Sequence, residues 1–388
     1  MTRQIKKIVL APDSFKGTLS ASRVCDLLAQ IVAQTLPGAE IRKYPMSDGG
    51  EGFLSAMLLA RGGSKTWVRV AGPLGSEIEA PYGVLTDGSV VIEMASASGL
   101  TLVDEASRDG FHATSLGTGQ LMRHALQRGF RNLIIGLGGS ASVDGGAGAA
   151  SSLGIRYLDK NDNEIQSGAG LTSLDHIDRS AMLPELNVAR ITFAVDVTNP
   201  LTGENGAARI FGPQKGASPQ QVELLDSGLK KLGQILMKDT KSDYGSLPGA
   251  GAAGGVAVPF LAYAGAKLAR GIELMMDAYG FDTELETADL VITGEGRTDA
   301  QSAMGKVLAG IGEKAASHQV PVIALSGTLG PGYQVVYEHG ISAVFSTIRS
   351  ADDLNDISGG AEKRLQSAAA EVLKLIAALT IKEQGNSF

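Results

Sequence analysis

Acidic residues follow the predicted strands of this chain at the points where the strands end. They are Asp13, Asp48 with Glu51, Asp144, Asp196, and Glu295 with Asp299. One such residue is usually a turn residue or a helix cap, which explains Asp48 and Glu51 equally well. Five acidic strand ends without accompanying His or Cys ligands favour a hard cation such as Mg²⁺ over zinc. The pattern therefore predicts phosphate chemistry.

The segment 136–146 is the richest glycine cluster of the chain and follows a predicted strand. Backbone N–H groups of Gly138, Gly139 and Ser140 are candidates to bind an anion such as phosphate. Tight packing at a strand–helix turn explains these glycines equally well. The segment also partly matches the dinucleotide-binding fingerprint, and it is similar to the phosphate loop of the homoserine and galactose kinase superfamily. The predicted strand order supports neither of these two matches.

Basic residues in glycine-rich loops are further candidates for binding phosphate or carboxylate groups. They are Lys16, Lys215, Arg297 and Lys306, although any one of them is more simply a solvated side chain. The chain has no P-loop, no protein-kinase catalytic loop and no Gly-x-Ser-x-Gly motif. Its five histidines stand apart without metal-ligand spacing, so we expect surface or helix positions for them.

Both ends of the chain alternate predicted strands with predicted helices. The strands are expected at 7–13, 41–44, 289–293, 321–325 and 341–345. The helices are expected after Ser20, at 53–59, from about Ser302, after the strand at 321–325, and at the C-terminus, where Leu365, Ala369, Val372, Ile376 and Leu379 face the core. This alternation predicts a doubly wound parallel sheet, in which ligands bind at the carboxyl ends of the strands.

The middle of the chain has a different pattern. Residues 66–94 alternate in polarity and contain turn signals, which predicts antiparallel hairpins. Further strands are expected at 133–136 and 191–195, with a hairpin over 155–165 and a helix that starts at Ser218–Pro219. We therefore expect two α/β domains, with a mixed-sheet domain inserted into the parallel-sheet domain. The predicted domains are 1–65 plus 281–388, and 66–280 with the glycine-rich loop, with the active site in the cleft between them.

Composition excludes several classes of protein. The 388 residues are 44% hydrophobic with a net charge of −7, which favours a soluble globular protein and disfavours a general nucleic-acid binder. No apolar window approaches the roughly 20 residues needed to span a bilayer, and no secretion signal is apparent. The single cysteine, Cys25, is expected to be a buried small hydrophobe in a reducing compartment. We expect a cytoplasmic protein without nucleic-acid or membrane partners.

Eight short blocks resemble the signature blocks of the bacterial type-1 glycerate kinases (glycerate 2-kinases). In chain order they are Asp13–Gly17, Ser47–Gly52, Gly136–Ala141, Asp144–Gly146, Asp196–Leu201, Phe211–Ala217, Gly251–Gly255 and Ile292–Gln301. They span nearly the whole chain, so the resemblance is specific. Leu308 is a small departure, because members of this family commonly have proline there.

The resemblance implies phosphorylation of D-glycerate by ATP with Mg²⁺, in a two-domain fold whose first domain is flavodoxin-like. It implies 2-phosphoglycerate as product, although the residues themselves also allow 3-phosphoglycerate. On this basis Asp196, Lys16, Asp13 and Glu295 are the expected catalytic residues, and Asp299 with Glu295 the expected metal ligands. The expected substrate and nucleotide contacts are Ser14, Asp48, Glu51, Gly138, Gly139, Ser140, Asp144, Asn199, Lys215, Gly294, Gly296, Arg297 and Gln301. The protein is expected to be a monomer or homodimer.

Two other classes of function remain open at this point. A nicotinamide-dependent hydroxy-acid dehydrogenase has a similar glycine turn, but it needs a base at the hydride site, and no histidine is well placed. A non-catalytic small-acid binding protein also has two α/β domains, but it needs no repeated carboxylates for a metal.

Overall fold

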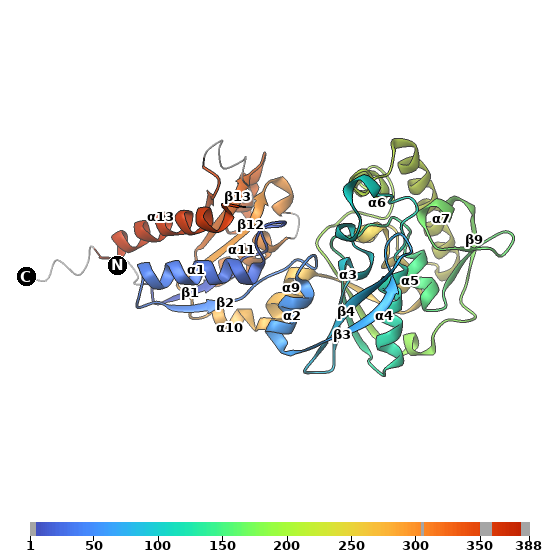
Figure 1. Cartoon of the computed structure of the whole chain (residues 1–388), viewed down its shortest axis with the longest axis horizontal. Coiled ribbons are helices and arrows are strands. Elements are labelled where there is room, and N and C mark those ends of the chain that lie inside the picture. The colour runs from blue at the N-terminus through green and yellow to red at the C-terminus, as the bar shows by residue number, and fades with distance from the viewer. Residues whose placement is uncertain (1–4, 304–305, 350–358, 382–388) are drawn as a thin grey trace, which may run out of the picture. The chain divides into compact units, whose positions relative to one another are not determined.

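The structure, a computed structural model, describes residues 5–303, 306–349 and 359–381, and it divides into two compact units. Unit 1 comprises Met1–Asp48 and Ile272–Phe388, and unit 2 comprises Gly49–Gly271. The chain therefore enters unit 2 after Asp48 and returns to unit 1 at Ile272. Figure 1 shows the elements of each unit.

Unit 1 is built on five parallel strands. The strands are β1 (Lys7–Leu10), β2 (Glu40–Lys43), β12 (Leu290–Thr298), β13 (Val322–Leu329) and β14 (Ala343–Ser346). They pair in the order β14-β13-β12-β1-β2, and every pairing is parallel. Counted within unit 1, this is the 2-1-3-4-5 strand order of flavodoxin-like folds. The expected doubly wound, flavodoxin-like sheet is confirmed.

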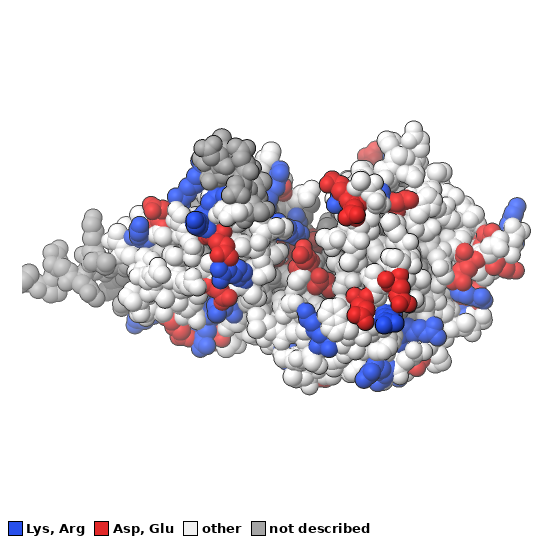
Figure 2. All heavy atoms as spheres, in the orientation of Figure 1, with Lys and Arg blue, Asp and Glu red and all other residues white. Residues whose placement is uncertain are grey.

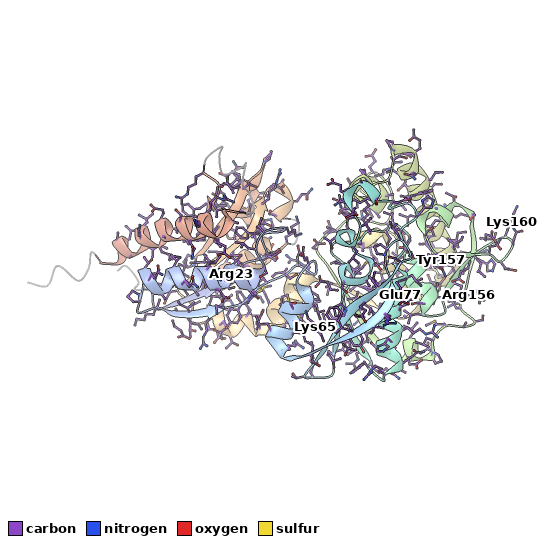
Figure 3. The ribbon with its side chains drawn as sticks, viewed as in Figure 1. Arg23, Lys65, Glu77, Arg156, Tyr157 and Lys160 are labelled. Atoms are coloured by element: carbon purple, nitrogen blue, oxygen red, sulfur yellow. The ribbon has the colours of Figure 1, made fainter. Side chains whose placement is uncertain are left out.

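Unit 1 contains α-helices and short 3-10 turns. They are α1 (Ala21–Thr35), α9 (Gly271–Tyr279), α10 (Phe281–Leu285), η7 (Ala300–Ala303), α11 (Val307–Ser317), η8 (Tyr333–His339) and α13 (Ala361–Ile381). Helix α1 starts at the Ser20 cap, and Cys25 is buried on its core face as expected. Arg23, labelled in Figure 3, forms a bidentate ion pair with Glu362 at two distances of 2.7 Å. This pair links α1 to α13, which pack together.

Three expectations for unit 1 are wrong in detail. The helix expected from Ser302 begins at Val307, because the chain first forms the short 3-10 turn η7. The helix expected after β13 is also a 3-10 segment, η8. Leu379 is 59% exposed, although Leu365, Ala369 and Val372 are buried as predicted. The apolar face of α13 therefore ends about one turn before its last predicted core residue.

Unit 2 contains a six-stranded mixed sheet and a smaller three-stranded sheet. Strands of the first are β3 (Gly63–Ala71), β4 (Glu77–Leu85), β5 (Val90–Glu93), β6 (Asn132–Gly136), β10 (Arg190–Val195) and β11 (Lys267–Arg270). Their order is β11-β10-β6-β5-β4-β3. The two pairings β3–β4 and β4–β5 are antiparallel, as expected for residues 66–94, and the other three are parallel. The prediction of a mixed sheet is confirmed.

The remaining elements of unit 2 cover this sheet and connect its strands. The helices are α2 (Phe53–Arg61), α3 (Ala95–Ser98), α4 (Leu116–Gln127), α5 (Ala147–Ser152), α6 (Ala207–Phe211), α7 (Pro219–Thr240) and α8 (Val258–Tyr263). The 3-10 turns are η1 (Leu100–Leu102), η2 (Glu105–Ser107), η3 (Gly168–Ser173), η4 (Pro184–Asn187), η5 (Pro213–Lys215) and η6 (Ala252–Gly254). Helix α7 starts at Ser218 with a capping box, as its sequence indicates.

Helix α2 belongs to unit 2, whereas the boundary predicted near residue 65 places it in the first domain. It packs against β4 and β5. The carboxylate of Glu93, at the end of β5, accepts hydrogen bonds from the backbone N–H groups of Gly52 (3.3 Å) and Leu54 (3.1 Å). Because Glu93 caps the first turn of α2 in this way, the helix is attached to unit 2 at its N-terminus.

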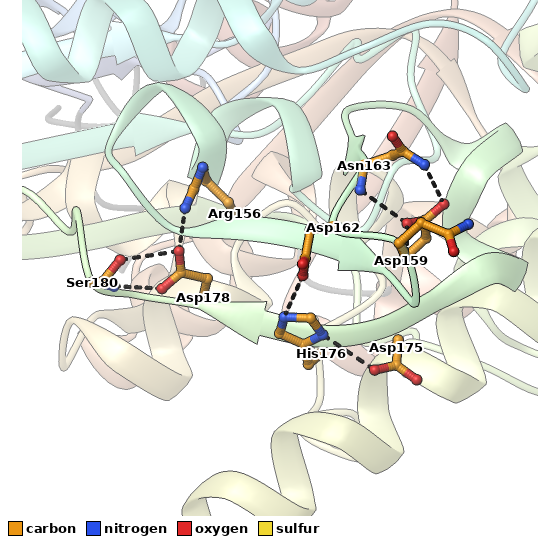
Figure 4. Close-up of polar contacts among 9 residues, drawn as sticks. Arg156, Asp159, Asp162, Asn163, Asp175, His176, Asp178 and Ser180 are labelled. Atoms are coloured by element: carbon orange, nitrogen blue, oxygen red, sulfur yellow. Dashed lines mark hydrogen bonds and ion pairs between the residues drawn. The ribbon is translucent and has the colours of Figure 1, made fainter.

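The smaller sheet contains the predicted hairpin over 155–165. Its strands are β7 (Arg156–Asp159), β8 (Glu164–Ile165) and β9 (Leu174–Asp178), all antiparallel. Asp159 closes the turn by accepting hydrogen bonds from the backbone N–H groups of Asn161 and Asn163 at 2.8 and 2.9 Å. Figure 4 shows the contact between Asp159 and Asn163. His176 on β9 lies between Asp162 and Asp175. These contacts lie within the three-stranded sheet and its turn, so His176 has a structural role there.

Acidic and basic side chains are interspersed over the face shown in Figure 2. Among the residues that the structure describes, no helix has the length and apolar character required to cross a membrane.

Candidate active site

Unit 1 contains a pocket of about 400 Å³. Its lining residues come from the C-terminal parts of β12 and β13, from the loops after β1, β2, β12 and β14, and from α13. Nine of the predicted site residues line it: Asp13, Ser14, Lys16, Asp48, Glu295, Gly296, Arg297, Asp299 and Gln301. Strands β1 and β12 are neighbours in the sheet, and the chain leaves them toward opposite edges. The pocket therefore occupies the switch point at which open α/β sheets bind ligands.

Three buried carboxylates lie in this pocket. Asp13, Asp48 and Glu295 are 5%, 3% and 7% exposed. Burial raises the pKa of Asp13 well above its usual range, and the carboxylate of Asp48 raises it further, while Lys16 opposes the change. Like charges in a poorly solvated place cannot all be ionised at low cost, so Asp13 is prepared to accept a proton.

The environment of Glu295 differs from that of Asp13. Its Oε1 atom accepts hydrogen bonds from the hydroxyls of Ser302 (2.5 Å) and Thr298 (3.0 Å). Burial raises the pKa of Glu295, and these two donors oppose the change. Two hydroxyl donors on one oxygen stabilise the ionised form. Burial therefore raises the pKa of both carboxyl groups, and two hydroxyl donors oppose this change at Glu295.

Cationic side chains and neutral loop residues complete the predicted set in unit 1. Lys16, Arg297 and Lys306 line the pocket, and Arg297 Nε lies 3.1 Å from Asp299 Oδ2. The other Asp299 oxygen accepts a hydrogen bond from the Gln301 backbone at 3.0 Å. Gly294 is not a lining residue. Its carbonyl accepts the Asp13 N–H at 2.9 Å, so it joins β1 to β12 beneath the pocket.

Sequence reasoning missed part of the pocket. Arg364 on the first turn of α13 lines it, as do Thr18, Thr328 and Thr347. Thr328 lies in β13 and Thr347 directly follows β14, shortly after the ends of the two predicted strands, so the strand-end argument could have found them. Arg364 lies within an amphipathic helix, where a basic residue on the polar face carries no signal of its own.

The glycine-rich loop of unit 2 is packed more tightly than an open phosphate loop. The Gly138 N–H donates to the Gly49 carbonyl at 3.1 Å. A Cβ atom at Gly138 would lie 2.3 Å from Gly50 Cα. Two glycine-rich segments therefore pack backbone against backbone, which explains the glycines at both places. The Gly138 N–H is already used, so it cannot bind a pyrophosphate in the manner of the dinucleotide fingerprint.

The buried side chain of Asp144 stabilises this loop of unit 2. This side chain has no exposed surface. One oxygen accepts from the backbone and hydroxyl of Ser115 at 2.8 and 2.7 Å, and the other from Gly146 N at 3.2 Å. Tyr157, labelled in Figure 3, donates its hydroxyl to the Gly145 carbonyl at 2.9 Å. These contacts favour loop packing, the alternative left open by the sequence.

Lys215 is buried beside the same loop. Its ammonium group donates to Ser140 Oγ and to the Ser142 carbonyl, both at 2.7 Å. Burial lowers the pKa of Lys215 to about 7, and the carboxylate of Asp144 opposes this change. The cation predicted for ligand binding is thus engaged with the loop itself.

The buried position of Lys215 predicts a stability that depends on pH. The unfolded chain binds the proton below its ordinary pKa of 10.5, whereas the folded chain binds it only below about 7. The unfolded state therefore holds more protons between these values, and stability must rise with pH there. Relative to Lys215→Met, wild type should gain about 2 kcal/mol in free energy of unfolding from pH 7 to pH 9.

Urea denaturation followed by tryptophan fluorescence measures this difference, because the single tryptophan, Trp67, lies on β3 in unit 2. The methionine variant has the same length without a titratable group, so contributions of other residues cancel. A difference between the proteins that does not change with pH would show that Lys215 keeps its ordinary pKa in the folded state.

The other predicted residues of unit 2 are not among the residues that line the pocket of unit 1. Asp196 directly follows β10. The strand β6, which pairs with β10, leads into the glycine-rich loop, so Asp196 and this loop both lie at the carboxyl edge of the mixed sheet. The side-chain amide of Asn199 donates to the Asn205 carbonyl at 2.8 Å. Glu51 is exposed just before α2. Catalytic or binding roles for these residues stay predictions.

The pocket residues fit Mg²⁺ in their donor chemistry. Asp13, Asp48, Glu295 and Asp299 offer only oxygen ligands, which suit a hard cation. Within the described part of the chain, no three His, Cys, Asp or Glu side chains are grouped closely enough to hold a metal by themselves. Mg²⁺ commonly binds one or two carboxylates together with substrate phosphates, and this pocket fits that arrangement. Among its described lining residues there is no histidine.

Comparisons with known proteins identify the family to which this chain is similar. The sequence model of the glycerate kinase family matches residues 8–377. A relative from Escherichia coli (strain K12), named glycerate 2-kinase, is 44% identical over 373 residues, which cover 96% of this chain and 98% of that protein. A relative from Halalkalibacterium halodurans, named glycerate kinase, is 42% identical over 367 residues, which cover 94% of this chain and 97% of that protein. A crystal structure from Salmonella typhimurium LT2, provisionally named glycerate kinase 2, has 42% identity and a TM-score of 0.81, covering 98% of this chain and 100% of that chain.

Proposed function

This chain belongs to the glycerate kinase family, and we propose that it transfers the γ-phosphate of ATP to the 2-hydroxyl of D-glycerate. The observation that carries the proposal is the pocket of unit 1, which combines buried carboxylates with lysine and arginine side chains at the switch point of a flavodoxin-like sheet. The choice of the 2-hydroxyl rests on the relative named glycerate 2-kinase. We further propose that the enzyme is cytoplasmic.

Asp13 is the proposed general base. In phosphoryl transfer the acceptor hydroxyl must lose its proton as its oxygen bonds to phosphorus. A carboxyl group with a raised pKa accepts that proton near neutral pH, and burial together with Asp48 gives Asp13 this property. At Glu295, burial also raises the pKa, but the two hydroxyl hydrogen bonds that Oε1 accepts oppose this change and favour the ionised form.

Lys16, Arg297, Lys306 and Arg364 are the proposed anion-binding groups. Both partners in the reaction are anionic, since glycerate has a carboxylate and ATP a triphosphate. Guanidinium groups bind carboxylate and phosphate oxygens in pairs, and ammonium groups neutralise charge on the transferring phosphoryl group. Closely held, correctly oriented reactants account for most of the rate in this type of reaction.

Glu295 and Asp299 are the proposed protein ligands of Mg²⁺. The ion would neutralise charge on the phosphate oxygens when bound. The side chain of Asp299 is 25% exposed and therefore accessible to a hydrated cation. Its ion pair with Arg297 sets the direction of one oxygen while the Gln301 backbone binds the other.

The proposal is tested by an ADP-release assay with D-glycerate, ATP and Mg²⁺, followed by phosphorus NMR of the product. Turnover that gives 2-phosphoglycerate is the expected result. A 3-phosphoglycerate signal would keep the kinase and correct the position of transfer. A folded protein that releases no ADP with D-glycerate would refute the proposed activity.

A further inference from the structure

A chain of buried hydroxyl groups lies behind the pocket of unit 1. Thr298 at the end of β12, Ser302 in η7 and Ser326 in β13 each have no solvent exposure. Thr298 Oγ1 and Ser326 Oγ are 2.6 Å apart. Three adjacent buried hydroxyls are costly to desolvate unless each finds a partner. Thr298 and Ser302 both have Glu295 as a partner, and the proposed function uses this residue.

The direction of each hydrogen bond follows from the proton count. The Asp299 N–H can only donate, and it points to Ser302 Oγ at 3.2 Å. Ser302 therefore accepts there and gives its own single hydrogen to Glu295 Oε1 at 2.5 Å. Thr298 gives its hydrogen to the same Oε1 atom at 3.0 Å. Ser326 must then be the donor in its contact with Thr298.

Both hydroxyls thus bind one oxygen of Glu295, Oε1. A glutamate side chain that lines the pocket, with one oxygen held from behind, has its other oxygen, Oε2, available to a bound ligand. Ser302 also connects two functional residues, because its one oxygen atom contacts the Glu295 carboxylate and the Asp299 backbone. The Ser302 backbone N–H returns to the Asp299 carbonyl at 3.0 Å, which closes the turn.

We propose that Ser302, assisted by Thr298 and Ser326, is a positioning residue that holds Glu295 and Asp299 in the geometry required for phosphoryl transfer. Ser302 itself touches no reactant and acts through these two residues. The kinetic consequences of this proposal rest on the proposed function. The hydrogen bonds that support the proposal are independent of that function.

The kinetic test is Ser302→Ala in the full-length protein. Loss of a hydrogen bond to a charged group should lower kcat about 10- to 100-fold. KM for glycerate should change by less than about threefold, because the groups that bind anions are intact. Ser317→Ala is the matched control: the Ser317 hydroxyl donates to the Lys314 carbonyl in unit 1, but it lies on the surface of α11, so kcat should be unchanged.

A double-mutant cycle separates positioning from general stabilisation. If Ser302 acts through Glu295, Ser302→Ala should cause little further loss of kcat in a Glu295→Gln background. Equal losses in both backgrounds would overturn the proposal. The pair Thr298→Ser and Thr298→Val gives a second test, since serine retains the hydroxyl and valine retains only the shape. Thr298→Ser should keep most of the activity, and similar losses in both variants would again contradict the proposal.

Hydrogen exchange gives a readout that needs no kinase activity. Removal of the Ser302 hydroxyl leaves the Asp299 N–H without its acceptor, so peptides covering 290–303 should exchange faster in Ser302→Ala than in Ser317→Ala. Unchanged exchange there would overturn the positioning role. A wild-type protein that does not phosphorylate glycerate would refute the proposed function alone, and the exchange comparison would still decide whether Ser302 holds this turn.

Discussion

Asp13→Asn is expected to lower kcat for glycerate phosphorylation by a factor of about 10² to 10⁴, the usual contribution of a general base. Asparagine has the same shape but cannot accept a proton from the substrate hydroxyl. The Asp13 carboxylate accepts a hydrogen bond from the Ser14 N–H at 2.6 Å, and an amide oxygen can make the same contact. The backbone of the β1 loop should therefore keep its conformation, so binding should remain measurable.

Steady-state kinetics with saturating ATP measures this effect, and KM for glycerate should change far less than kcat. Asp26→Asn is a suitable control, because Asp26 lies on α1 in the same unit and pairs with Lys43 on the surface at 2.9 Å. Its substitution should leave kcat within about twofold, since surface ion pairs contribute little. If Asp13→Asn also retains kcat within a few-fold of wild type, Asp13 is not the base.

Gly294→Ala is expected to destabilise unit 1 severely. Gly294 lies in the middle of the sheet, where it pairs with Leu325 on β13. An added Cβ atom would lie 2.0 Å from the Leu325 carbonyl oxygen. Because that oxygen belongs to the backbone, strands β12 and β13 must separate to accept a methyl group. We expect a loss of at least about 3 kcal/mol in the free energy of unfolding.

Loss of activity should accompany this destabilisation, since Glu295 is the next residue of β12. Thermal denaturation followed by circular dichroism measures the change in stability. Gly38→Ala is the matched control, because a Cβ atom there meets no atom within 4 Å. Its stability should remain within about 0.5 kcal/mol of wild type. A Gly294→Ala protein that is as stable as the control would show that the two strands can separate at little cost.

The sequence was sufficient to predict the part of the site that lies at strand ends. Alternation of strands and helices implies parallel strands, and parallel strands bring their carboxyl ends to one edge. Asp13 and Lys16 after β1 therefore meet Glu295 and Asp299 near the end of β12, although more than 270 positions separate them in the chain. The parallel topology brings these residues together, and residue types and their spacing are enough to predict that topology.

Sequence reasoning could not distinguish a glycine that binds a ligand from one that packs against another glycine. Gly138 and Asp144 fit the pattern of an anion-binding loop, but the Gly138 N–H is bonded to Gly49 and the Asp144 carboxylate to Ser115. Both partners are remote in sequence. Whether an N–H group is free for a ligand depends on what packs against it, and no local pattern encodes that information.

Local chemistry therefore determined the fold class of both units, the family and the carboxylates of the pocket. Tertiary structure alone decided the protonation and orientation of these groups. Asp13 acquires its raised pKa from burial and from Asp48, and Glu295 is oriented by Thr298 and Ser302. Burial beside the glycine-rich loop removes Lys215 from solvent and lowers its pKa to about 7. Desolvation and hydrogen-bond direction arise only when distant segments pack together, which is why residue types could name these groups without assigning their roles.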